Sequence, residues 1–306
     1  MNAQTARARR SSVAAIAIFV ATAVTSIACR HGSSGGDGAA PSASASSSSV
    51  AAVAGGIPVA SALILSTNNA DGLPVYAGRA GAVEGFVKAI GLPPLDATNP
   101  PPPPSDKCAE SRAMYMKAFR VGPDGALADA IVGATGYEAY VPPKGDAKTV
   151  HIKGCAFDTR TLALTFGQRL EVRNHDREAY LPHLNGARNP ALMVAMPNGD
   201  AVRIYPREPG RYLLTDDIKH PWMATDVFVF KYATHDVTGA DGRYRIEGIP
   251  EGRVKISVWH PRIGQTIEKV VEVRGGETVK GVDFEVPNEA PKAAPSGSNK
   301  VPTDLR

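Results

Sequence analysis

Serine, histidine, cysteine and carboxylate side chains are the groups that could catalyse a reaction in this 306-residue chain. No Gly-x-Ser-x-Gly sequence stands between a predicted strand and a predicted helix, and there is no His-Glu-x-x-His pair or glycine-rich phosphate loop. Asp216 and Asp217 are adjacent carboxylates. Neighbouring side chains of a strand point to opposite faces, so this pair is poorly placed for joint acid–base work. We therefore expect a protein that is not an enzyme and has no catalytic residues.

The N-terminal residues predict export from the cytoplasm. Arg7, Arg9 and Arg10 precede an uncharged, largely apolar run over residues 11–28. A basic segment followed by a short apolar one is typical of a secretory signal peptide, so we predict that residues 1–28 are such a signal. The run barely reaches the length of a bilayer span, and an uncleaved membrane anchor is the alternative.

Two cleavage sites compete at the end of this run. Ser26-Ile27-Ala28 has the small-x-small form that ordinary signal peptidase cuts. The same residues precede Cys29 and resemble the lipobox of bacterial lipoproteins, although that motif usually has Leu and a small residue where Ser26 and Ile27 stand. The resemblance implies that Cys29 is lipidated and anchors the protein to a membrane of the bacterial cell envelope. A plain periplasmic or secreted protein is the alternative.

The segment that follows Cys29 is rich in Gly, Ala and Ser. Such a composition has too little apolar surface to offset the entropy lost on ordering. We predict that residues 29–80 form a disordered tether or linker, although residues 62–80 also fit a loosely attached strand.

The cysteine count agrees with export. Three cysteines would leave one odd thiol in an oxidising compartment. If Cys29 is acylated, Cys108 and Cys155 remain as an even pair, and a disulfide between them is expected outside the cytosol. Two unpaired cysteines in the core are the alternative.

Charge argues against nucleic acid as a partner. The chain has 34 basic and 30 acidic residues and a formal net charge of +4. The basic residues are scattered rather than gathered on one segment, so the sequence shows no nucleic-acid footprint.

From Ala82 onward, short apolar runs alternate with Gly, Pro, Asn and Asp, which is typical of a sandwich or barrel. We predict an all-β chain with little helix and two consecutive β-sandwich domains, over residues 82–233 and 235–286. A disordered tail is predicted over residues 287–306. Strands are expected over residues 83–90, 114–121, 128–132, 161–166, 169–174, 201–205, 211–215, 226–231, 243–247, 254–259, 267–273 and 279–286.

The second of these domains carries three motifs, at residues 238–244 (TGADGRY), 248–252 (GIPEG) and 258–260 (VWH). They resemble the carboxypeptidase regulatory-like family, a small transthyretin-like β-sandwich. The resemblance implies a structural module. Related folds have been grouped with carbohydrate-binding domains, so a glycan is one expected partner and another envelope protein is the other.

The first domain resembles the cupredoxin-like domains that precede such modules in bacterial envelope proteins. The motifs are residues 153–155 (KGC), 173–176 (RNHD) and 220–223 (HPWM). In copper-bearing relatives these motifs imply two His ligands, a Cys and a Met, with the thiolate as the strongest bond to copper. Here Asp217 stands where the cysteine belongs, and Tyr180 stands where the first histidine belongs.

The remaining groups leave two hypotheses. The first is a non-enzymatic binding or scaffold protein with a degenerate cupredoxin-like domain and no cofactor. The second is a copper-binding or electron-transfer protein with a remodelled, colourless site made of His183, Asp217, His220 and Met223, since imidazole, carboxylate and thioether are all copper ligands. The identity of residue 217 favours the first. His175, His235 and His260 have no partner at ligand spacing and are expected to be structural, and His151 is expected in a loop.

Overall fold

The computed structural model describes residues 56–91, 106–117, 119–185, 193–263 and 265–287. The predicted signal peptide over residues 1–28, the lipidation site at Cys29, most of the tether and nearly all of the tail lie outside the described residues. None of the helices within the described ranges has the length and apolar character needed to cross a bilayer.

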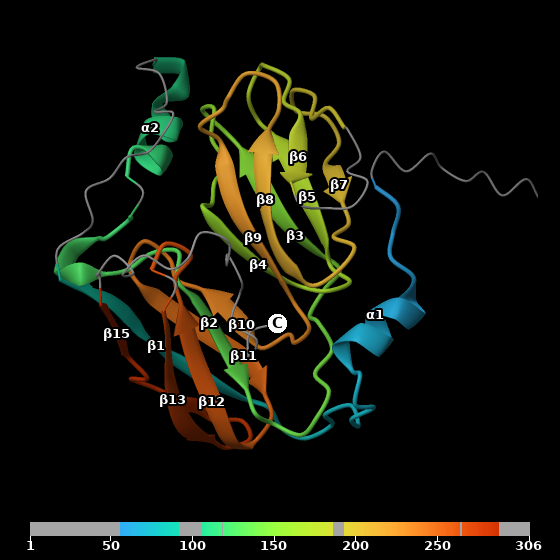
Figure 1. Ribbon diagram of the computed structural model, residues 1–306, viewed down its shortest axis with the longest axis vertical. Helices are drawn as coiled ribbons and strands as arrows, with labels where there is room; N and C mark the ends of the chain where they lie inside the picture. The colour runs from blue at the N-terminus through green and yellow to red at the C-terminus, as the bar shows by residue number, and fades with distance from the viewer. Residues whose placement is uncertain (1–55, 92–105, 118, 186–192, 264, 288–306) are drawn as a thin grey trace, which may run out of the picture. The chain divides into compact units, whose positions relative to one another are not determined.

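One pair of sheets is built from consecutive strands and is called the inserted sandwich here. A three-stranded sheet has the order β3-β5-β7, and a four-stranded sheet has the order β4-β9-β8-β6 (Figure 1). Side chains from both sheets share one apolar core. The strands are β3 (Ala147–Ile152), β4 (Thr161–Thr165), β5 (Arg169–Asn174), β6 (Pro182–Asn185), β7 (Val202–Ile204), β8 (Gly210–Asp216) and β9 (Ala224–Phe230).

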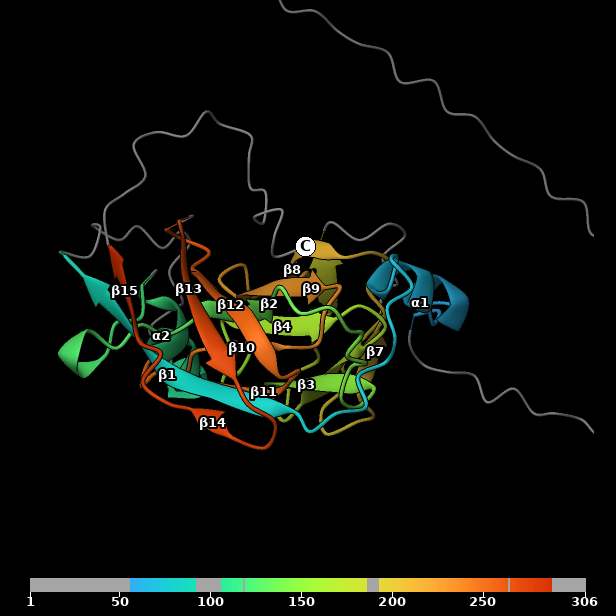
Figure 2. The same ribbon diagram turned by 90° about the horizontal axis from the view of Figure 1, so that it is seen from below.

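The second pair of sheets is discontinuous in sequence and is called the split sandwich. One sheet has the order β11-β1-β14 with β15 also on β1, and the other has the order β10-β2-β12-β13. Figure 2 shows β1 beside β14, which lies almost two hundred residues later in the chain. The strands are β1 (Gly81–Ile90), β2 (Ile131–Thr135), β10 (His235–Val237), β11 (Arg243–Ile249), β12 (Gly252–Trp259), β13 (Thr266–Val273), β14 (Thr278–Val279) and β15 (Phe284–Pro287).

The strand pairing corrects the expected domain boundaries. The all-β class is confirmed, but β1 and β2 precede the boundary at residues 233–235 and pair with strands that follow it. The inserted sandwich therefore occupies the connection between β2 and β10. Local patterning finds strands but does not name their partners, which is why the sequence placed β1 and β2 in the first domain.

Strand β9 shows how the two sandwiches share side chains. Val227 and Val229 point into the core of the inserted sandwich, while Phe228 and Phe230 belong to a third apolar cluster. The rings of Phe228 and Trp259 of β12 meet edge to face, 5.1 Å apart between centroids. A strand covered on both faces reads as a continuous apolar run, as ATDVFVF does.

Two helices differ from the expectations. Helix α1 (Ser61–Asn68) forms where a disordered linker was predicted, because Ile64 packs against the inserted sandwich and Asn68 donates a side-chain hydrogen bond to the Phe166 carbonyl. Helix α2 (Ala109–Tyr115), preceded by the 3₁₀ turn η1 (Asp106–Cys108), replaces the start of the strand expected over residues 114–121. A second 3₁₀ turn, η2, spans Pro123–Gly125.

The disulfide between Cys108 and Cys155 is confirmed, with Cα atoms 4.9 Å apart. It joins the start of α2 to the loop after β3. Ser111 and Tyr115, four residues apart on α2, are buried on the same side, and the Tyr115 hydroxyl accepts the backbone N–H of Phe157. The bond and the helix therefore attach this segment to the inserted sandwich.

Replacing Cys108 and Cys155 together by Ser should lower the free energy of unfolding by about 4 kcal/mol, since the bond spans a sequence separation of 47 residues. Denaturant unfolding measures the loss. Cys29→Ser leaves the disulfide intact and is the matched control. Reactive thiols at both positions of the unfolded, unreduced protein would contradict the pairing.

His260 predicts a pH dependence of stability. Burial disfavours its charged form and, despite attraction from Asp129 and a hydrogen bond to the Ala128 carbonyl, lowers its pKa to about 4. As pH falls from 7 to 5, the imidazole takes up a proton in the unfolded chain but not in the folded one. The free energy of unfolding should therefore fall by on the order of 2 kcal/mol. Unfolding of His260→Asn at both pH values should lack this part of the loss. Equal slopes for variant and native chain would contradict it.

Candidate functional site

The four candidate metal ligands divide between different partners. His183 on β6 lies opposite Thr215 of β8, and its Nδ1 is 2.6 Å from Oδ2 of Asp217. The other oxygen of Asp217 accepts a hydrogen bond from the Thr215 hydroxyl at 3.2 Å. This carboxylate, about one third exposed, is thus committed to two neighbours at the end of β8.

His220 has a different carboxylate. Its Nδ1 lies 2.6 Å from Oδ2 of Asp216, whose side chain is fully buried. The adjacent residues Asp216 and Asp217 therefore do face different surroundings, as the alternation of a strand predicts. Met223 closes the turn through its N–H to the His220 carbonyl and is buried in the core of the inserted sandwich.

The structure thus pairs His183 with Asp217 and His220 with Asp216. Across the residues it describes, no three or more His, Cys, Asp or Glu side chains are grouped to hold a metal ion. A metal site that uses His183, Asp217, His220 and Met223 together stays a prediction.

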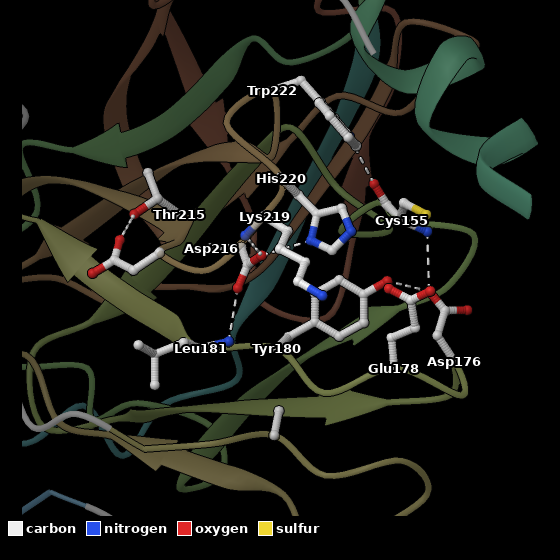
Figure 3. A network of polar contacts seen from close by, with 12 residues as sticks. Cys155, Asp176, Glu178, Tyr180, Leu181, Thr215, Asp216, Lys219, His220 and Trp222 are labelled. Atoms are coloured by element: carbon white, nitrogen blue, oxygen red, sulfur yellow. Dashed lines mark hydrogen bonds and ion pairs between the residues drawn. The ribbon is translucent and has the colours of Figure 1, made fainter. Parts of the chain in front are cut away.

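Tyr180 packs directly on His220 (Figure 3). The two rings stack with centroids 4.8 Å apart, and the edge of Trp222 meets His220 from another side at 5.2 Å. The Tyr180 hydroxyl donates a 2.7 Å hydrogen bond to Oδ2 of Asp176. Burial, reinforced by the hydrogen bond to and the charge of Asp176, raises the pKa of Tyr180 above its ordinary value. Its phenol therefore stays protonated and acts as a donor.

Asp176 links this ring stack to the disulfide loop. Gly154 and Cys155 have φ values of 55° and 57°, so their consecutive N–H groups form a concave anion-binding arrangement. These groups donate to the two oxygens of Asp176 at 2.8 and 3.0 Å. The indole N–H of Trp222 donates to the Cys155 carbonyl at 3.0 Å (Figure 3). A Cβ at Gly154 would lie 1.8 Å from Oε2 of Glu110 and would displace that side chain, and the φ of 55° also favours glycine.

Asp216 remains ionised in this setting. Burial alone would raise its pKa, but hydrogen bonds from His220 and from the N–H groups of Leu181 and Lys219 outweigh that effect and hold the pKa below its usual value. A carboxylate only accepts hydrogen bonds, so Nδ1 of His220 carries the proton. The lone pair of the neutral imidazole then lies on Nε2, so only that nitrogen could bind a metal.

We call Asp176, Tyr180, His220 and Asp216 the buried polar chain. Sequence analysis located Tyr180 and His220 from the cupredoxin-like motifs and noted Asp176 within one of them. It missed the structural role of Asp216, because the spacing of four residues to His220 resembles many chance spacings.

Comparison with known proteins gives a weak likeness and no family. No protein-family profile matches the chain, and no curated protein sequence matches it. An oxidised amicyanin mutant aligns at 20% identity over 27% of this chain and 81% of its own, with a TM-score of 0.25. Amicyanin from Paracoccus versutus aligns at 20% identity over 28% and 83%, also with a TM-score of 0.25. A copper-containing nitrite reductase from Thermus scotoductus aligns at 24% identity over 31% and 24%, with a TM-score of 0.24.

Tyr180→Phe should lower the free energy of unfolding by about 1.5–3 kcal/mol, because it removes a buried hydrogen bond to a charged group while keeping the ring on His220. Denaturant unfolding measures the loss, and a double-mutant cycle with Asp176→Asn should show coupling between the two side chains. Tyr76→Phe removes an exposed hydroxyl and should change little. Unchanged stability of Tyr180→Phe would contradict the buried polar chain.

Proposed function

We propose that this protein is a non-enzymatic binding or scaffold protein of the bacterial cell envelope, and that its cupredoxin-like sandwich holds a hydrogen-bonded network in place of copper. The observation that carries the proposal is the Asp216–His220 pair stacked on Tyr180. At the three positions where the sequence motifs imply copper ligands, His220 is bonded to a buried carboxylate, Tyr180 to Asp176, and Asp217 to His183.

The chemistry of these side chains disfavours copper. Nδ1 of His220 carries a proton, so only Nε2 of that residue could bind a metal, and the protonated phenol of Tyr180 is a weak ligand. Asp217 offers a hard oxygen where a soft thiolate would hold copper most strongly. The alternative, copper binding or electron transfer through His183, Asp217, His220 and Met223, requires the separate His183–Asp217 and His220–Asp216 pairs to converge on one ion.

Export and lipid anchoring form the second part of the proposal. The disulfide Cys108–Cys155 supports an oxidising compartment. The order of signal, Cys29 and tether in the sequence supports a lipid-anchored domain, with a glycan or another envelope protein as its partner and no role for nucleic acid.

Copper titration tests the loss of the blue site. The native chain with Cu(II) should show no intense absorption at about 600 nm, where thiolate-to-copper charge transfer appears in a His₂Cys site. The variant Tyr180→His, Asp217→Cys, Asp216→Ala restores the two ligands and frees His220, and it should gain the band. The same variant without Asp217→Cys is the control. An intense band in the native chain would overturn the proposal.

Anchoring is tested by fractionation. Cys29→Ser should move the protein from the membrane to the soluble envelope fraction, because the cysteine carries the lipid in this account. A variant that stays with the membrane would contradict lipidation and favour an uncleaved N-terminal anchor.

A further inference from the structure

Two histidines outside the buried polar chain meet on the three-stranded sheet of the inserted sandwich. His151 lies on β3 rather than in the expected loop, and His175 follows the last residue of the adjacent strand β5. Nδ1 of His151 is 2.8 Å from Nε2 of His175, and the ring centroids are 5.0 Å apart. The positions are 24 residues apart in sequence, so no local spacing indicates the pair.

We propose that His151 and His175 form a binding site for a divalent transition-metal ion of the Cu(II), Ni(II) or Zn(II) class. Neutral imidazole is a preferred ligand for these ions. Two nitrogens at about 2.0–2.1 Å from one ion are about 2.9 Å apart at a right angle and about 3.3 Å apart at the tetrahedral angle. The 2.8 Å pair lies end to end, so both rings must turn toward a common point to hold an ion. The ion takes the place of the proton between the two nitrogens, and that proton moves to the other ring nitrogen of the imidazole that carried it.

The backbone holds both ligands in position. The N–H of His151 donates to Oδ1 of Asp158 at 3.0 Å, and the N–H of Asp158 donates back to the His151 carbonyl at 2.9 Å. The N–H of His175 donates to the Ile152 carbonyl at 2.9 Å, which extends the pairing of β3 with β5. The two backbones are therefore fixed, and only the imidazole rings need to turn to bind an ion.

The surroundings leave the pair open to a cation. Within the part of the chain that the structure describes, no carboxylate is hydrogen-bonded to either imidazole, whereas His183 and His220 are each bonded to one. The Asp158 carboxylate holds a negative charge beside His151. His175 is exposed and leaves room for water as the remaining ligands. This inference is independent of the proposed function, because neither imidazole belongs to the buried polar chain, although His175 directly precedes Asp176.

Calorimetric titration of the untagged full chain with Zn(II) at neutral pH tests the site. We expect one ion per chain, with both imidazoles bound in their neutral form. His151→Ala and His175→Ala should each weaken binding by about tenfold or more. His183→Ala is the matched control and should bind as the native chain does. Cu(II) should bind more tightly than Ni(II).

A second readout keeps the result separate from any effect on folding. The imidazole ¹⁵N signals of His151 and His175 should shift on addition of Zn(II), while those of His220 should not. His175 is exposed, so His175→Gln should keep the native unfolding midpoint while losing the affinity. Absence of binding, unchanged affinity in both alanine variants, or loss of binding in His183→Ala alone would overturn the proposal. A blue copper band in the native chain would overturn the proposed function without touching this site.

Discussion

Carboxylates taken out of water need hydrogen-bond donors, and two of them, the half-buried Asp176 and the buried Asp216, lie at one end of the inserted sandwich. Asp176 accepts hydrogen bonds from the consecutive N–H groups of Gly154 and Cys155 and from the Tyr180 hydroxyl. Asp216 accepts hydrogen bonds from Nδ1 of His220 and from the N–H of Leu181. Because Tyr180 stacks on His220, the two carboxylates are joined into one chain. Removing either acid would leave several buried donors without acceptors, which costs more than the bond itself.

The disulfide joins α2 to this end of the inserted sandwich, and strand β9 packs against both sandwiches. Cys155 is both a donor to Asp176 and a partner of Cys108, so the bond ties α2 to the same loop that holds the buried polar chain. From α2 the chain passes to β2, which belongs to the split sandwich. On the other side, β9 fills both the inserted core and the aromatic cluster with Trp259. Side chains of the two sandwiches therefore share one apolar cluster at β9.

The pattern of apolar and turn residues predicted the features that depend on neighbouring residues, above all the positions of strands. Strand β5 has the predicted bounds, and β4, β8, β9, β12 and β13 lie within a few residues of theirs, because alternation and turn residues are visible in sequence. The pairing of β1 with β11 was not predictable, since no short-range signal reports it. Likewise, motifs located Tyr180 and His220, but the choice of Asp216 over Asp217 as the partner depends on which face of β8 is buried. The His151–His175 pair arises only from the parallel pairing of β3 with β5.

The central claim is that hydrogen bonds, and not a metal, hold His220. Anomalous diffraction at the copper edge, from crystals soaked in Cu(II), tests it at the level of single atoms. The account predicts no copper peak within bonding distance of His220, with the Asp216 and Tyr180 contacts intact. A copper peak bonded to either ring nitrogen of His220 would contradict it.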